Sequence, residues 1–171
     1  MNGLQSQLPA TRRRRPVLLL VAAALVAIVV GGSAYWAIAC PCDRLPGLYL
    51  RGREASEAVT DWSFANQVPL CQIQVDTGLL PHALNLNCWA GSAGDLYLGC
   101  ANCDGKRWSH VAVANNQARL RLGTTVYPVT LTRIVDAGEL DHAWESRYVK
   151  TAGAARTARP AGWWSFRVVS R

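Results

Sequence analysis

An uncharged, strongly apolar stretch near the N-terminus constrains this chain most. No charged residue occurs between positions 17 and 39. At about 1.5 Å of rise per helical residue, such a stretch crosses the roughly 30 Å of a bilayer core. Tyr35 and Trp36 lie near its far end, where amphipathic rings favour the membrane interface. The sequence therefore predicts a basic N-terminus over residues 1–15 and one transmembrane helix over residues 16–39.

The charge distribution predicts the orientation of this helix. Four consecutive arginines, Arg12 to Arg15, stand directly before the apolar stretch. Because cytoplasmic flanks carry an excess of Lys and Arg, the N-terminus is expected in the cytoplasm and everything after Cys40 outside, with the lipid bilayer as partner. A cleaved signal peptide and lipidation of Cys40 are the alternatives. The arginine run supplies much of the net charge of +7, so no nucleic-acid binding is predicted.

The rest of the chain has room for one domain. The sequence predicts a linker over residues 40–47, a domain over residues 48–150, and a second linker with a last strand over residues 151–171. Short strands are expected at Leu48–Leu50 and around Asp61–Phe64.

Two runs with alternating apolar residues predict a β-hairpin. The runs are separated by a turn-rich segment, and folding them symmetrically places all apolar residues on one face. Cys71 and Cys88 then lie opposite each other, at a separation that suits either a disulfide or two buried thiols. The predicted pairs are Val75–Leu84, Ile73–Leu86 and Cys71–Cys88.

The other face of this hairpin carries four side-chain amides, from Gln72, Gln74, Asn85 and Asn87. A solvated sheet face is one interpretation. A ligand-facing wall is the other, because amides both donate and accept hydrogen bonds.

The stretch from Gly94 to Gly123 contains several elements in succession. Alternation predicts a strand near residues 96–100, helical spacing then begins at Trp108, and alternation returns at Arg119–Leu122. Further on, the sequence predicts a strand within Val126–Val135, a helix capped by Asp136 with Glu139, and a last strand within Trp163–Val169.

Cys100 and Cys103 form a Cys-x-x-Cys pair in this central stretch. Outside the cell, six cysteines favour disulfides, and a structural bridge between these two is the preferred interpretation. A four-thiolate zinc site completed by Cys40 and Cys42 is a second. A thiol-redox pair is a third.

Lys106 and Arg107 stand at the start of the predicted helix, close to the loop amides. Helix N-termini and basic side chains both favour phosphate, so this corner is a candidate anion site, with a solvated helix start as the alternative. His82, His110 and His142 lack metal-ligand spacing and are expected at the surface or as caps. The sequence contains no hydrolase, phosphate-loop or zinc-protease motif, and no residue is assigned as a catalytic acid or base.

The order of elements resembles that of one known superfamily. A hairpin is followed by a strand and a loop with Lys106-Arg107-Trp108, a helix ending in Val113-Ala114-Asn115, two strands, and an Asp-capped helix. This order resembles the pyridoxamine-phosphate-oxidase-like split-barrel flavin-binding proteins, including their deazaflavin-dependent nitroreductase relatives. The resemblance implies a mainly β fold, a six-stranded antiparallel split β-barrel with short helices, and usually a homodimer.

The resemblance also implies a cofactor, FMN or deazaflavin F420, near the dimer interface. Lys106 and Arg107 would face its phosphates, Asn85 and Asn87 would line its ring, and Trp108 would pack beside it. The implied activity is hydride transfer by an oxidoreductase, with the protein binding and orienting the cofactor.

Two alternatives to this function come from other classes. One is a non-catalytic binding or assembly domain that keeps the barrel without the cofactor. The other is a thiol-redox protein that uses Cys100 and Cys103.

Overall fold

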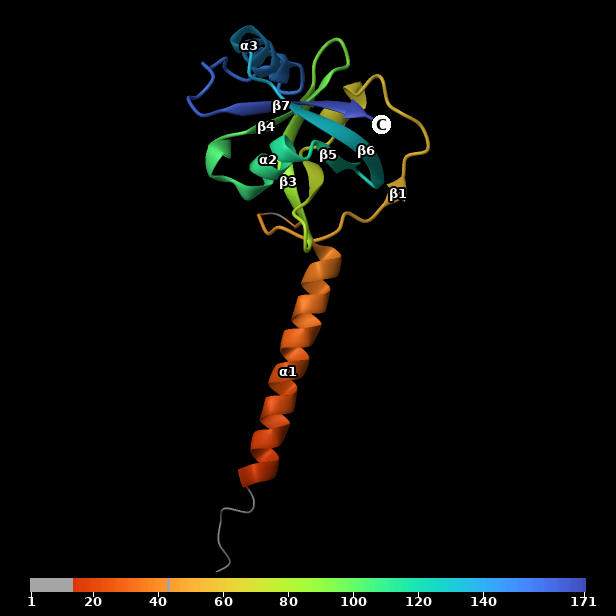
Figure 1. Cartoon of the computed structure of the whole chain (residues 1–171), viewed down its shortest axis with the longest axis vertical. Helices are drawn as coiled ribbons and strands as arrows, with labels where there is room; N and C mark the ends of the chain where they lie inside the picture. The colour runs from red at the N-terminus through yellow and green to blue at the C-terminus, as the bar shows by residue number, and fades with distance from the viewer. Residues whose placement is uncertain (1–13, 43) are drawn as a thin grey trace, which may run out of the picture. The chain divides into compact units, whose positions relative to one another are not determined.

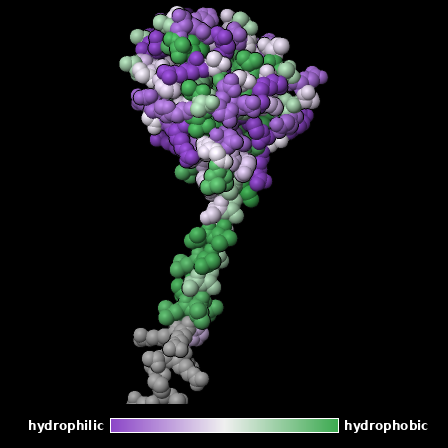
Figure 2. Space-filling view, viewed as in Figure 1, coloured by the Kyte–Doolittle hydropathy of each residue, from purple (hydrophilic) through white to green (hydrophobic). Residues whose placement is uncertain are grey.

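The computed structural model describes residues 14–42 and 44–171, and these form two compact units divided between Ala37 and Ile38. Helix α1, Arg14–Ala39, carries the predicted apolar stretch, and Figure 2 shows its hydrophobic surface. Within the described residues, the segment Pro16–Ala39 is the one helix long and apolar enough to cross a membrane. Most of the predicted basic N-terminus lies outside the described residues.

The second unit contains the predicted six-stranded antiparallel β-barrel (Figure 1). Neighbouring strands follow the order β6-β5-β2-β3-β4-β7, and pairing between β6 and β7 closes the barrel. A two-residue strand, β1, pairs in parallel with β6 outside this ring. The bounds are β1 Arg53–Glu54, β2 Cys71–Asp76, β3 Pro81–Ala90, β4 Leu96–Cys100, β5 Gln117–Leu122, β6 Thr125–Arg133 and β7 Trp164–Ser170.

Strand β7 belongs to the barrel although it follows the predicted linker. Phe166 pairs with Leu98 of β4, and Val168 pairs with Leu131 of β6. Phe166 is fully buried in the core. The barrel therefore uses residues beyond 150, and the compact unit runs from Ile38 to Arg171.

Two α-helices and three short 3-10 helices lie between the strands along the described sequence of the second unit. They are α2, Arg107–Ala114, and α3, Ala137–Ser146, with the short 3-10 helices η2, Ser63–Gln67, η3, Cys103–Gly105, and η4, Arg147–Val149. The predicted cap of α3 is confirmed, because the Asp136 carboxylate accepts a hydrogen bond of 2.8 Å from the Glu139 N–H.

Two predicted strands are wrong. Residues 48–50 form no strand, and the segment after Asp61 forms η2 instead. The Asn66 side chain there binds both the N–H and the carbonyl of Ala90, at 2.8 and 3.0 Å. A side chain thus makes the sheet-edge hydrogen bonds that a strand backbone would have made.

The hairpin prediction is right about the faces and wrong about the register. The observed pairs are Cys71 with Leu86, Ile73 with Leu84, and Val75 with His82. Each residue of β2 pairs with the β3 residue two positions before its predicted partner. Because side chains alternate between the two faces of a strand, a shift of two positions keeps every side chain on the predicted face.

A tight turn causes this displacement. Asp76 pairs with Pro81, which leaves only four residues in the loop. The Asp76 carboxylate accepts from the Gly78 N–H at 2.9 Å, and the Thr77 hydroxyl donates to the Leu80 carbonyl at 2.5 Å. Gly78 has φ of +98°, a conformation that favours glycine. The paired strands therefore extend closer to the turn than in the predicted hairpin, in which Val75 paired with Leu84.

All six cysteines are paired, as Cys40–Cys42, Cys71–Cys88 and Cys100–Cys103. The bridge between Cys71 and Cys88 spans 5.7 Å between Cα atoms, although the two residues are not direct cross-strand partners. The zinc hypothesis is wrong, because its four thiols form two separate disulfides and the described residues contain no cluster of three metal-ligating side chains.

Candidate functional site

The chain itself binds part of the predicted amide face. The Gln72 side chain donates to the Pro41 carbonyl at 2.9 Å, and the Gln74 side-chain oxygen accepts from the Leu50 N–H at 2.8 Å. Both partners belong to the segment that enters the barrel before β2. These two amides therefore hold the protein's own backbone.

Two arginines of β5 complete this arrangement. The Arg119 guanidinium donates to the Leu50 carbonyl at 3.1 Å and pairs with the Glu54 carboxylate at 2.7 Å. Arg121 donates to the Arg51 carbonyl at 2.9 Å. We call this surface the covered face; it consists of Gln72, Gln74, Arg119 and Arg121, which contact Pro41 and residues 50–54.

Asn85, the third predicted amide, lies in a different setting. It lines a groove of about 490 Å³ beside β3, within the range of roughly 300–1,000 Å³ typical of small-molecule sites. Two backbone hydrogen bonds between Gly47 and Ala83, at 2.7 and 2.9 Å, hold the opposite wall against β3. The groove is lined by Arg44, Leu45, Pro46, Leu70, His82, Leu84 and Asn85.

The groove has a positive electrostatic character. Burial lowers the pKa of His82, and the nearby charge of Arg107 lowers it further. The charge of Arg107 thus reaches His82 from outside the groove lining. Arg44 is the cation that lines the groove. Because none of the described lining residues is acidic, the groove favours an anionic group with an apolar portion.

The loop before α2 fixes the position of Arg107. The buried Ser109 hydroxyl contacts the carbonyls of Cys103 and Lys106, at 2.5 and 2.6 Å. The Cys100–Cys103 disulfide ties the same loop to the end of β4. Lys106 and Arg107 are exposed at the start of α2, so their side chains project from a rigid turn.

The other two predicted site residues lie elsewhere. Trp108 is 3% exposed in the barrel core, 5.4 Å from the Phe166 ring between centroids, and its buried indole N–H has no hydrogen-bond partner among the described residues. Asn87 is exposed and lines a different pocket. The structure places Asn85 in the groove lining, leaves Arg107 outside the lining but near enough to affect the pKa of His82, and places Trp108 and Asn87 elsewhere.

Sequence reasoning missed two groove residues. His82 was expected at the surface or as a cap, and Arg44 lay in a predicted linker. The available signal was the turn chemistry of Asp76–Gly78, because a short turn extends β3 to Pro81 and brings His82 into the sheet.

The Cys-x-x-Cys pair is buried. Cys100 is 2% exposed and Cys103 is fully buried. A disulfide that exchanges with a partner must be reached by an attacking thiolate. Burial therefore favours the structural interpretation of this bridge over the thiol-redox one.

No protein-family model matches the chain, and no curated protein matches its sequence. Solved structures do resemble it. A conserved hypothetical protein of Mycobacterium tuberculosis aligns with a TM-score of 0.52 at 13% identity, over 70% of this chain and 86% of that protein. A candidate 5-nitroimidazole antibiotic resistance protein of Bacteroides thetaiotaomicron aligns with a TM-score of 0.51 at 13% identity, over 77% and 90%.

A third structure, a candidate pyridoxamine 5'-phosphate oxidase of Listeria innocua, aligns with a TM-score of 0.49 at 12% identity, over 62% of this chain and 86% of that protein. The likeness to solved structures agrees with the fold expected from the order of elements. At these identities the likeness defines the fold, and the predicted split β-barrel is confirmed.

Proposed function

We propose that this protein is a membrane-anchored split-barrel oxidoreductase that binds a flavin-type cofactor, FMN or F420, in the groove beside His82. The observation that carries the proposal is a groove lined by Arg44, by the Asn85 amide and by several apolar side chains, with Arg107 near enough to affect His82. Flavin nucleotides join a flat, largely apolar ring to an anionic phosphate. The lining therefore fits both parts of such a ligand.

The groove residues have different roles in this proposal. Arg107 and Arg44 bind the phosphate, for which the guanidinium fork is well suited. Asn85 offers a donor and an acceptor to polar ring edges, while Leu70 and Leu84 pack against the ring and exclude water. When bound, the cofactor supplies hydride transfer, and this chain's residues bind and orient it. Lys106 lies beside Arg107 and adds positive charge.

The membrane anchor is part of the proposal. The apolar α1 follows a run of arginines, which favours a cytoplasmic N-terminus and a barrel outside the cell. Three disulfides suit an oxidising compartment. A homodimer in the bilayer also belongs to the proposal, and the mass of the detergent-solubilised protein would test it.

A cofactor titration tests the proposed activity. The full chain, purified in detergent, is titrated with FMN and with F420 while cofactor fluorescence is recorded. We expect saturable binding of one of them, and about tenfold or more weaker binding after Arg107→Ala, because a hydrogen bond to a charged group contributes about 1.5–3 kcal/mol. Arg156→Ala is the control, since Arg156 is exposed and pairs with Glu145. Absence of binding by either cofactor would refute the proposal.

One observation favours the alternative of a non-catalytic barrel. The covered face engages two amides and two arginines with the protein's own backbone. Such a face supports a structural or binding role without a cofactor. If neither cofactor binds and the folded protein remains stable, this alternative replaces the oxidoreductase.

A further inference from the structure

A second pocket lies further along β3, next to η4, and has no role in the proposed function. It encloses about 220 Å³, so it suits a ligand smaller than a nucleotide. None of its described lining residues is acidic. The residues that matter for its chemistry are Asn87, Trp89, Arg147, Lys150, Thr151 and Trp163.

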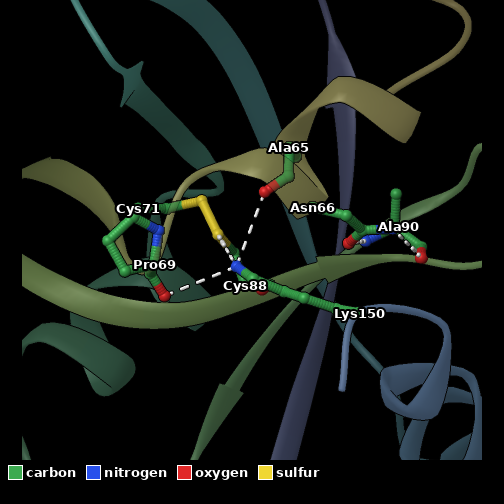
Figure 3. Close-up of a disulfide and its surroundings, with 7 residues drawn as sticks. All are labelled: Ala65, Asn66, Pro69, Cys71, Cys88, Ala90 and Lys150. Carbon is green, nitrogen blue, oxygen red and sulfur yellow. Dashed lines mark hydrogen bonds between the residues drawn. A yellow bond between two sulfur atoms is a disulfide. The ribbon is translucent and has the colours of Figure 1, made fainter. Parts of the chain in front are cut away.

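Lys150 is held in this pocket by backbone carbonyls (Figure 3). Its ammonium donates to the Cys88 carbonyl at 2.7 Å and makes longer contacts with the carbonyls of Pro69 and Ala65, at 3.4 and 3.5 Å. Partial burial lowers its pKa. None of these partners carries a charge, so the ammonium is fixed in place without a counter-ion.

Arg147 is also held by uncharged groups, in this case an indole ring and two hydroxyls. Its guanidinium lies 3.6 Å from the centre of the Trp144 ring and donates to the Tyr148 and Thr157 hydroxyls, at 2.6 and 2.9 Å. Its buried Nε has no hydrogen-bond partner among the described residues. The neighbouring carboxylate, Glu145, pairs with Arg156 at 2.8 Å. The second cation of the pocket therefore also has only neutral partners.

The aromatic wall of the pocket is rigid. The Trp89 indole donates to the Ala143 carbonyl and the Ser146 hydroxyl, both at 2.9 Å. The Trp163 ring packs against the Trp144 ring, with 4.8 Å between centroids. The half-buried Trp163 ring is therefore supported by Trp144 before a ligand arrives, which reduces the entropy lost on binding.

We infer that this pocket binds a small aromatic carboxylate, with the carboxylate against Arg147 and Lys150 and the ring against Trp163. Two cations without an ion pair to any described residue favour an anion. The small volume and the flat indoles favour a planar group of one ring. Asn87 and Thr151 lie at the exposed side of the pocket and offer further hydrogen bonds.

Three probes test this inference on the full chain in detergent, with intrinsic tryptophan fluorescence as the readout. Benzoate has both the ring and the charge, benzamide has the same shape without the charge, and inorganic phosphate has the charge without the ring. We expect saturable quenching by benzoate, with at least tenfold weaker binding of benzamide and of phosphate. Equal affinity for benzoate and benzamide would overturn the anion assignment, and the absence of saturable benzoate binding would overturn the site.

Variants locate the binding. Asn87→Asp introduces a carboxylate at an exposed position, where folding tolerates it, and should weaken benzoate at least tenfold through repulsion. Asn87→Ala, which removes the amide without adding a charge, should weaken benzoate by clearly less than Asn87→Asp does. Arg147→Gln should weaken benzoate tenfold or more, whereas Arg156→Gln should leave it unchanged. Unchanged affinity in both Asn87→Asp and Arg147→Gln would refute the inference.

Discussion

The covered face and the groove contain the same kinds of side chain and use them differently. On the covered face, Gln74 and Arg119 bind the backbone of the segment that enters the barrel. In the groove, Asn85 and Arg44 line an open space of about 490 Å³, with Arg107 close to its wall. Both surfaces border the β2–β3 hairpin.

The comparison shows that residue type does not distinguish a polar surface covered by the chain from an open groove. A buried polar group must find a partner, and on the covered face the chain supplies it. In the groove the wall is held to β3 at Gly47, and an open space remains beside His82 and Asn85. Measuring both the unfolding free energy and the cofactor affinity of a variant separates the two surfaces.

The largest expected effect comes from the core, not from either surface. Trp108→Ala should lower the free energy of unfolding by about 3–5 kcal/mol, because it removes a buried indole and leaves a cavity. Urea denaturation of the solubilised protein measures this change. Trp108→Phe should be much milder, since the indole N–H has no partner to lose. An unchanged stability with reduced cofactor affinity would instead place Trp108 in the binding site.

Arg119→Ala should have the next largest effect, about 1–3 kcal/mol of unfolding free energy. The change leaves the Leu50 carbonyl without its charged donor and Glu54 without its ion pair. Cofactor affinity should not change. Arg53→Ala is the matched control, because Arg53 is an exposed arginine on the same side of the barrel. Loss of affinity in Arg119→Ala at normal stability would make the covered face part of the site.

Arg107→Ala should give the opposite result. Its effect on unfolding should stay within about 0.5 kcal/mol, as is usual for an exposed side chain, while cofactor binding weakens. The substitution should also raise the pKa of His82, because the charge of Arg107 contributes to its depression. NMR titration of the imidazole would detect the shift. An unmoved pKa would show that Arg107 does not act on the groove.

The smallest effect concerns acid stability. The folded state lowers the pKa of His82, so below about pH 6.5 the unfolded chain binds more protons at this residue than the folded protein. The contribution of His82 to stability is therefore full above that pH and is lost as the pH falls through the folded pKa. Thermal denaturation between pH 5 and 7 should show a shallower pH dependence in His82→Gln than in the wild type.

Periodicity predicted most of the elements correctly. Alternation located the strands that became β2 to β7, and helical spacing located α2, because both patterns follow from which side chains face the core. The register failed for a related reason. A displacement of two residues preserves both faces, so the apolar pattern could not distinguish the predicted pairs from the observed ones.

The candidate site was only partly predictable. Lys106 and Arg107 were found because basic residues at a helix start form a local pattern. His82 and Arg44 were missed because the groove forms only when Gly47 pairs with Ala83, far apart in the chain. Asn87 and Asn85 stand two positions apart on one strand, yet they line different pockets.

The sequence by itself determined the apolar helix, the alternation of the barrel strands and the cap of α3. These features depend on residues close together in the chain, where spacing alone decides which face is apolar. Only the tertiary structure decided that β7 closes the barrel. It also decided that Gln72 and Gln74 form hydrogen bonds with the backbone of the segment before β2, and that the Lys150 ammonium binds the Cys88 carbonyl. These contacts join distant segments, and their geometry depends on how the whole barrel closes.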